Sequence, residues 1–297
     1  MATAAHAEPL PPPRTIGPDD ARHARTWAGY LEHLRWIAGH GPMVRELAAS
    51  QLQLTVSRSR LYYLWWLLDP VLDTACYALL FLVVARGGAV AEGSPPLIAF
   101  LLAGLIPWRL CASSWQIAAG LWQNNKGLLD QIRFPVLALM IARFATEAWL
   151  YGIALVVLVA ACVLSGVAPA WTWLLLPVWV VLHALLVIAV MPLFAAMTAY
   201  SVDLLKLLPY ALRLAFFGAP VLYSIPDGWP GWAKQILWLN PLTPLVTGYR
   251  DLLLYARLPS TTTLIVFPLV VAVLLLLSTR LFVALERNMI RNVARLY

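Results

Sequence analysis

The sequence predicts an all-α membrane protein with six transmembrane helices, and three observations lead to this fold class. Of its 297 residues, 62% are hydrophobic and only 12% are charged, whereas soluble domains average about half apolar and about a quarter charged residues. The apolar residues form runs of roughly 18 or more, which is long enough to cross a hydrocarbon core of ~30 Å. Basic residues gather beside these runs, as the positive-inside rule describes.

The apolar runs place the spans at approximately 63–85, 97–121, 136–164, 172–199, 204–223 and 261–283. Basic residues orient these spans. They occur throughout the N-terminal segment, at Lys126 and Arg133 after the second span, at Lys206 after the fourth, and at Arg287 and Arg291 near the end. Both termini are therefore expected in the cytoplasm, with the chain crossing the plasma membrane several times.

The N-terminal segment lies outside the predicted spans. Residues 1–25 are rich in Pro and Ala and contain no apolar core of a signal peptide, so they are expected to form a disordered cytoplasmic tail. Residues 26–60 are expected to form amphipathic helices in the cytoplasm or at the membrane surface, with 43–60 lying in the headgroup plane. The transmembrane domain covers 61–285, and 286–297 form a cytoplasmic C-terminus.

The long third outer loop, 224–260, contains two short apolar-aromatic segments, GWAKQILWL and LVTGYRDLLLY, separated by prolines. Each segment is too short to span a bilayer. They are predicted to be interfacial or re-entrant half-helices in the outer leaflet, anchored by aromatic side chains. The aromatic anchors are Trp229, Trp232, Trp238 and Tyr249.

Charged residues at membrane depth are costly, so they indicate pairing or function. Asp69 and Asp73 share one face of the first span, and Arg109 lies at a similar depth in the second span. An ion pair between Arg109 and one of these carboxylates is predicted. In the alternative, the acids lie in the interface and Arg109 extends to the headgroups.

Aromatic residues recur on one face of the second span. Trp108, Trp115 and Trp122 are spaced by seven residues, which places them in one slowly drifting stripe. Such a stripe either packs against other helices or provides a path on which the apolar faces of sugar rings can slide. Late in the fifth span, Phe216, Phe217 and Tyr223 could serve in the same way.

A polar segment, QNNKGLLDQIRFP at 123–135, interrupts the apolar runs after the second span. Leu128, Leu129 and Ile132 fall on one helical face, whereas Lys126, Asp130 and Arg133 are charged. A short helix of this kind suits a groove on a partner protein.

Several chemistries have no motif in this sequence. There is no GxxxxGK[ST] loop for nucleotide binding and no HExxH or GxSxG motif. The net charge of +7 does not form a basic patch with interleaved aromatics, so nucleic acid is not an expected partner. His183 stands alone in an apolar helix and is interpreted as a hydrogen-bonded packing residue, and no metal site is expected.

Five stretches in order resemble one family, the permease subunits of ABC-2-type exporters of lipid-linked polysaccharides such as O antigen and teichoic acid. The stretches are LYYLWWLLDP (61–70), AGLIPW (103–108), NNKGLLDQIRFP (124–135), YSVDLLKLLPYALRLAFFGAPVLYSIP (200–226) and LNPLTPLVTGYRDLLL (239–254).

This resemblance implies the fold of a type V exporter-like ABC-2 transmembrane domain. It implies a homodimer in membrane lipids with a pore between the subunits and two copies of a separate ABC ATPase, which binds ATP and Mg²⁺, so this chain is not itself catalytic and holds no cofactor. Asn124, Lys126, Leu128, Leu129, Asp130, Ile132, Arg133 and Phe134 would form the coupling helix on the ATPase. The amphipathic helix would be a lipid gate. The outer gate would contain Trp229, Trp232, Trp238, Pro241, Tyr249 and Arg250, and aromatics would line the sugar path.

Two alternatives stay open: an ABC-2 exporter of a drug or small lipid, and a membrane-embedded glycosyl- or acyltransferase. The Ala- and Arg-rich composition resembles that of high-GC actinobacterial proteins. In mycolic-acid actinobacteria, the comparable exporter moves the lipid-linked galactan of the cell wall.

Overall fold

The computed structural model describes residues 26–57, 95–125, 127, 135–225 and 228–296, together with Leu64, Leu68, Leu72, 75–77 and Leu79. Every regular element among these residues is helical. The elements are α2 (Trp27–Gly39), α3 (Gly41–Ser57), α5 (Leu97–Ala119), α6 (Leu121–Asn124), α8 (Val136–Leu164), the 3₁₀ helix η1 (Trp171–Leu175), α9 (Leu176–Tyr200), α10 (Asp203–Phe217), α11 (Gly231–Leu239), α12 (Leu242–Leu253) and α13 (Thr261–Leu296).

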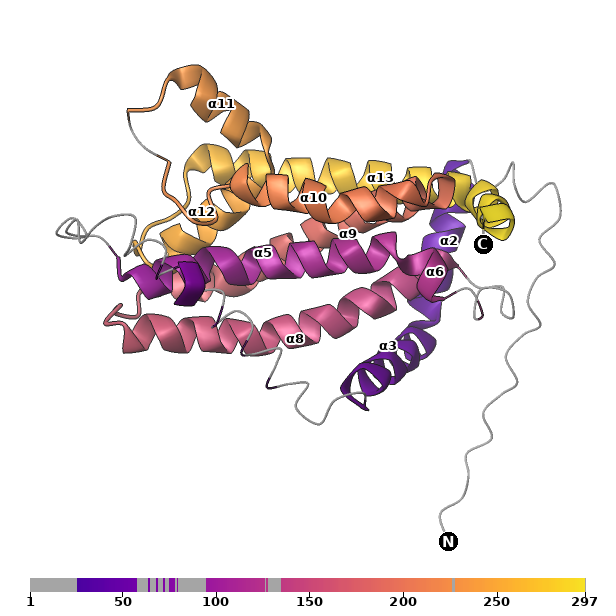
Figure 1. Ribbon diagram of the computed structural model, residues 1–297, viewed down its shortest axis with the longest axis horizontal. Helices are drawn as coiled ribbons and strands as arrows, with labels where there is room; N and C mark the ends of the chain where they lie inside the picture. Colours follow the sequence, from indigo (N-terminus) through magenta and orange to yellow (C-terminus); the bar gives the residue numbers. More distant parts are fainter. Residues whose placement is uncertain are drawn as a thin grey trace, which may run out of the picture.

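Five of these helices, α5, α8, α9, α10 and α13, run along the long axis of the molecule (Figure 1). The short helices α11 and α12 lie at one end of this bundle, which we call the α12 end. At the opposite end, the α2 end, lie α2, α6 and the last turns of α13 (Figure 1). The predicted class, an all-helical membrane domain, is therefore confirmed for the described residues.

Helix α5 is the central element of the bundle. It packs against α8, α9, α10 and α12, and its first half is buried almost without interruption from Ala99 to Pro107. Small residues allow this close packing. Gly104 in particular lies so close to the carbonyl oxygen of Val221 and the guanidinium of Arg250 that an added Cβ would overlap both.

Four described helices are long and apolar enough to cross a membrane: Leu97–Ala119, Val136–Leu164, Trp171–Tyr200 and Thr261–Ala294. They agree with the predicted spans 97–121, 136–164, 172–199 and 261–283 to within a few residues, except that the last helix continues beyond its span. The first predicted span, 63–85, lies mostly outside the described residues. The six-span count therefore stays a prediction.

The predicted fifth span, 204–223, is helical only as far as Phe217, where α10 ends. Its 15 residues cover about 22 Å, less than a ~30 Å hydrocarbon core. Gly218 caps the helix, and Pro220 has no N–H with which to continue it. The oxygens of Pro220, Val221 and Tyr223 accept hydrogen bonds from the side chain of Arg250.

The N-terminal helices lie at the α2 end. Helix α2 packs on α13, where the Tyr30 and Thr279 hydroxyls are 2.8 Å apart and the Arg280 guanidinium lies 3.5 Å from the ring centroid of Trp27. Helix α3 packs against α8. Its bounds, Gly41–Ser57, lie close to the predicted helix 43–60, and its position in the headgroup plane stays a prediction.

Candidate functional site

At the α12 end, the predicted motif LNPLTPLVTGYRDLLL makes several polar contacts with neighbouring elements. Asn240 begins the organised part of this stretch. Its side-chain oxygen accepts from the Leu242 N–H at 3.1 Å, and its amide nitrogen donates to the Gly218 carbonyl at 3.1 Å. Asn240 therefore satisfies an N–H at the start of α12 and also connects α12 to the end of α10.

Gly248 gives α12 close contact with α9. A Cβ on Gly248 would overlap the indole ring of Trp179, whose N–H donates to the Leu245 carbonyl at 3.0 Å. Only the absence of a side chain leaves room for this ring. The glycine of the motif is thus a packing requirement between α9 and α12.

Tyr249 joins a buried hydrogen-bonded chain that crosses four helices. The Tyr151 hydroxyl of α8 donates to the Tyr249 hydroxyl at 2.8 Å, which lies 3.2 Å from His183 Nδ1 of α9. The other ring nitrogen of His183 lies 3.3 Å from Cys111 Sγ of α5. All four side chains are buried. The interpretation of His183 as a hydrogen-bonded packing residue is confirmed.

Arg250 is 3% exposed and lies inside the protein at the α12 end. Its Nη1 donates to the carbonyls of Pro220 and Tyr223, the latter at 2.9 Å. Its Nη2 donates to the carbonyls of Val221 and, at 3.4 Å, Phe100. The guanidinium carbon also lies 3.6 Å from the centroid of the Phe100 ring, a cation–π distance. One side chain thereby holds the segment after α10 against α5.

The electrostatics at this end follow from burial. Desolvation lowers the pKa of the Arg250 guanidinium to about 9, so it stays protonated at neutral pH. Next to it, burial raises the pKa of Asp251, while a hydrogen bond and ion pair with Arg257 act in the opposite direction. Arg257 Nε lies 2.7 Å from the Asp251 carboxylate.

The two predicted short helices of the third outer loop are present as α11 and α12. Helix α11 projects from the bundle at the α12 end (Figure 1), with Trp232 67% and Trp238 44% exposed. Trp229 lies before α11, with its ring 6.1 Å from that of Tyr223. Pro241 directly precedes α12. The gate function of these residues stays a prediction.

The predicted aromatic path separates into two groups. Trp108 of α5 and Phe216 of α10 have ring centroids 5.5 Å apart, and the ring centroid of Tyr77 lies 5.8 Å from that of Phe216. Phe217 adjoins Phe216 and is 59% exposed. The hydroxyl of Tyr223 donates to the Phe217 carbonyl at 3.1 Å. These side chains form a partly exposed aromatic cluster along α10.

Trp115 and Trp122 instead lie in the core of the chain. Their indole N–H groups donate to the carbonyls of Val187 and Ala195 in α9 at 3.4 and 2.7 Å. Trp115 is 5% exposed and Trp122 is fully buried. For these two residues the structure favours the packing interpretation over the sugar path, because their ring faces contact the protein itself.

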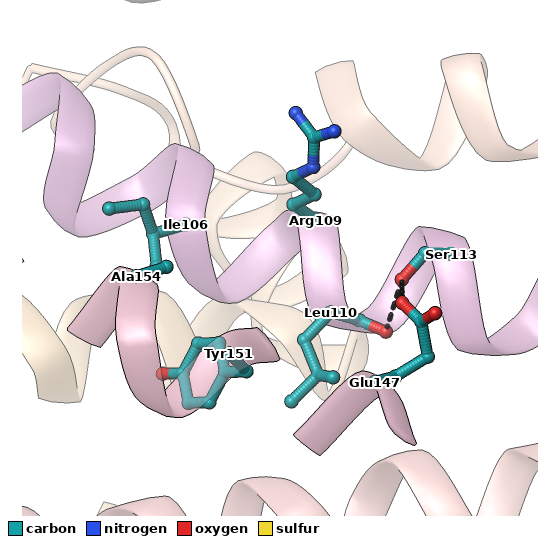
Figure 2. A pocket seen from close by; sticks show the side chains of 7 residues that line it. All are labelled: Ile106, Arg109, Leu110, Ser113, Glu147, Tyr151 and Ala154. Atoms are coloured by element: carbon teal, nitrogen blue, oxygen red, sulfur yellow. Dashed lines mark hydrogen bonds between the residues drawn. The ribbon is translucent and has the colours of Figure 1, made fainter. Parts of the chain in front are cut away.

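Arg109 lies on α5 beside a small hollow that Figure 2 shows from close by. Ser113 donates to the Glu147 carboxylate at 2.7 Å, and the Arg109 side chain points away from this bond (Figure 2). Asp69 and Asp73 lie outside the described residues, so the predicted Arg109 ion pair stays a prediction. Arg143, which the spacing predicts to pair locally with Glu147, donates to Asn125 at 3.0 Å.

Of the predicted coupling segment, only Asn124 and the flanking residues are described. Asn124 is exposed and ends α6, whereas Lys126, 128–130 and 132–134 lie outside the described residues. Both flanks are anchored in the bundle. The Asn125 amide donates to the Leu121 carbonyl at 2.7 Å, and the Val136 N–H donates to the Glu286 carboxylate at 2.6 Å.

Sequence reasoning missed the roles of Glu286 and Cys111. Glu286 receives an N–H at the start of α8 although it is 150 residues away in the chain. The position of the Glu286 carboxylate near the end of a span was a signal that it has a partner. The identity of that partner, the Val136 N–H, can be known only from the fold. Cys111 lies in an apolar run with no metal-ligand spacing around it, and the fold places it at one end of the Tyr249 chain.

The apolar spans and the helical bundle define a multi-pass membrane protein. A profile of the ABC-2 type transporter family matches residues 44–254, and the chain belongs to that family. Members of this family form the membrane subunit of a transporter.

Two relatives refine this comparison. The chain is 29% identical over 237 residues to an O-antigen export system permease protein RfbA of Myxococcus xanthus. The matched region covers 80% of this chain and 89% of the relative. It is 24% identical over 208 residues to a protein of the same description from Klebsiella pneumoniae, covering 70% of this chain and 78% of that relative.

Proposed function

We propose that this chain is the permease subunit of an ATP-driven exporter that moves a lipid-linked polysaccharide from the cytoplasm across the plasma membrane. The observation that carries this proposal is the similarity to O-antigen export permeases over 80% of this chain and 89% of the relative. Two copies of the chain would form the pore, and two ABC ATPase subunits would bind ATP and Mg²⁺.

A glycan cannot cross hydrocarbon unaided, because each hydroxyl stripped of water costs several kcal/mol, roughly 4–8 in the most apolar reference. A path that offers aromatic faces and scattered polar groups binds each sugar weakly, so the polymer can slide. The cluster of Trp108, Phe216 and Phe217 along α10 supports such a path, since Phe217 is exposed beside the buried ring of Phe216 and the half-buried ring of Trp108.

We assign the α2 end to the cytoplasm and the α12 end to the outer face. The positive-inside rule supports this orientation. Lys206 at the start of α10 and Arg287 and Arg291 near the end of α13 all lie toward the α2 end. Trp229, Trp232 and Trp238 would then lie in or above the outer leaflet as a gate.

The segment 124–134 would be the coupling helix that docks on the ATPase. Its anchored flanks support this role. Arg143 holds Asn125 on one side, and Glu286 holds Val136 on the other, so a push on the segment would reach α8 and α13 directly. Replacing Leu129 or Ile132 with Asp should leave ATP hydrolysis but abolish export. Undiminished export in both variants would exclude the segment as the coupling site.

The exported glycan is proposed to be a cell-wall polysaccharide, with a lipid-linked galactan as the particular candidate. The test is depletion of the chain in its own cells, followed by analysis of lipid-linked glycans. Accumulation of full-length glycan on the cytoplasmic side supports export. Unchanged glycans with altered small-lipid or drug efflux would favour the small-molecule exporter, and loss of glycan synthesis would favour a transferase.

A further inference from the structure

A cavity of about 400 Å³ opens at the α12 end, between the segment after α10, helices α11 and α12, and the start of α13. Its volume lies within the range of small-molecule sites. It lies within one copy of the chain and shares only Tyr223 with the aromatic cluster along α10. From its lining we propose that it is a binding site for one sugar unit of a neutral glycan. This inference rests on the proposed export function.

Aromatic side chains supply one part of the lining. Tyr223, Trp238 and Tyr255 all contribute to the cavity, and Trp238 is 44% and Tyr255 37% exposed. Their rings are therefore accessible although they are not freely solvated. A sugar ring has flat C–H faces that pack against such aromatic surfaces, and aromatic residues with one apolar and one polar edge suit a partly wet site.

Paired charges and hydroxyls supply the other part. Asp251 and Arg257 line the cavity and form an ion pair at 2.7 Å. A paired carboxylate still has acceptor positions, and a guanidinium with one N–H engaged still has donors. Ser260 and Thr263 add hydroxyl groups that lie 2.8 Å from each other. This combination matches the rim of hydroxyls on a sugar, which both donate and accept.

The lining carries one net positive charge, from Arg250 and Arg257 against Asp251, but the arrangement of its donors favours a neutral ligand over a phosphate. Asp251 neutralises Arg257, and the terminal nitrogens of Arg250 already donate to four carbonyl oxygens. Arg250 also lines the cavity, but its Nε is buried, so it offers no accessible donor to a ligand. The remaining donors on Arg257 lie beside the Asp251 carboxylate, which would repel a phosphate but can share a sugar hydroxyl.

Arg250 would act here as a positioning residue. By holding the carbonyls of Pro220, Val221 and Tyr223, it fixes the wall from which Tyr223 projects. A wall fixed before binding reduces the entropy cost of binding. The proposed site is therefore preformed in the single chain and does not depend on the ATPase.

The experiment uses the purified full-length permease in detergent. Methyl glycosides of galactose (pyranose and furanose), mannose and rhamnose are titrated separately, with inorganic pyrophosphate as the anionic probe, and tryptophan fluorescence and saturation-transfer NMR as readouts. Saturable binding of at least one glycoside is expected, weakened about tenfold by Trp238→Ala and by Asp251→Asn. The matched control is Trp171→Ala, an exposed tryptophan of η1 outside the cavity, which should bind as the parent does.

Three results would overturn the proposal: no saturable glycoside binding by the parent, equal binding by the Trp238→Ala and Trp171→Ala variants, or saturation by pyrophosphate alone. Thermal unfolding of each variant identifies a loss of fold, and Trp238→Phe, which keeps an aromatic face, should retain part of the affinity. Export failure and site failure are distinguishable. Sugar binding without glycan export in cells would refute the proposed function. Glycan export by a protein whose cavity binds no glycoside would refute this inference.

Discussion

Two arginines stack on aromatic rings at opposite ends of the bundle, and they are held in different ways. Arg250 at the α12 end lies 3.6 Å from the Phe100 centroid, and Arg280 at the α2 end lies 3.5 Å from that of Trp27. The ring contact is thus nearly the same. Arg250 additionally donates to carbonyl oxygens of α5 and of the segment after α10 and is 3% exposed, whereas Arg280 is only half-buried.

The difference extends to the two regions around these residues. At the α12 end, side chains donate to backbone carbonyls of other elements: Thr172 to Leu252, Trp173 to Leu253, and Arg250 to the segment after α10. At the α2 end, α2 meets α13 through side-chain pairs, such as Tyr30 with Thr279. Displacing elements at the α12 end would leave buried carbonyls unpaired, which is costly.

The largest loss of stability is expected when Arg250 is replaced, with the same replacement of Arg280 as the comparison. Arg250→Met should lower the free energy of unfolding by about 3 kcal/mol or more, because several buried carbonyls lose their donor at roughly 1–3 kcal/mol each. Arg280→Met should cost only about 1 kcal/mol, the value of a cation–π contact. Denaturant unfolding in detergent measures both. Equal losses for the two variants would contradict the comparison.

A second test adds a single methyl group at two glycines. Gly104→Ala should destabilise the protein by about 1–3 kcal/mol, because its Cβ would overlap the backbone oxygen of Val221, which Arg250 holds in place. Gly152→Ala in α8 is the matched control. Its Cβ would meet nothing within 4 Å, so a change between zero and a gain of about 1 kcal/mol is expected. Melting temperatures of the two variants are compared. An unchanged melting temperature for Gly104→Ala would show that the backbone at the α12 end can shift to accept the added methyl group.

Removing one hydroxyl from the buried chain tests its contribution at the α12 end. Tyr249→Phe should cost about 1–2 kcal/mol, because Tyr151 and His183 both lose a buried partner. Tyr210→Phe on α10, where the side chain is 66% exposed, should have almost no effect. If the two variants unfold alike, the chain does not stabilise the contact between α8, α9 and α12.

The smallest effect is expected at the α2 end. Glu286→Ala removes the acceptor at the start of α8 and should cost about 1 kcal/mol, whereas Glu286→Gln keeps an acceptor and should cost less. Hydrogen exchange provides the local readout. Amides at the start of α8 should exchange faster in Glu286→Ala, with those of α12 unchanged. Faster exchange at both ends would mean that the ends are not independent.

The sequence predicted part of the site correctly and part of it incompletely. Pro230 and Pro241 precede α11 and α12, so the division of the third outer loop could be recognised from local residues alone. The seven-residue spacing of Trp108, Trp115 and Trp122 could not show that Trp108 meets α10 while the other two meet α9, because this depends on which helix lies opposite each turn.

By itself the sequence determined the class of protein and the approximate bounds of four spans. Hydropathy acts along contiguous residues, and a span of about 20 apolar residues requires no knowledge of its neighbours. Only the tertiary structure decided what Arg250 binds. Its acceptors lie at Phe100 and at 220–223, 150 and about 30 residues away in the chain. Such partners are chosen by packing, because a buried donor bonds to whichever carbonyl the fold brings within reach.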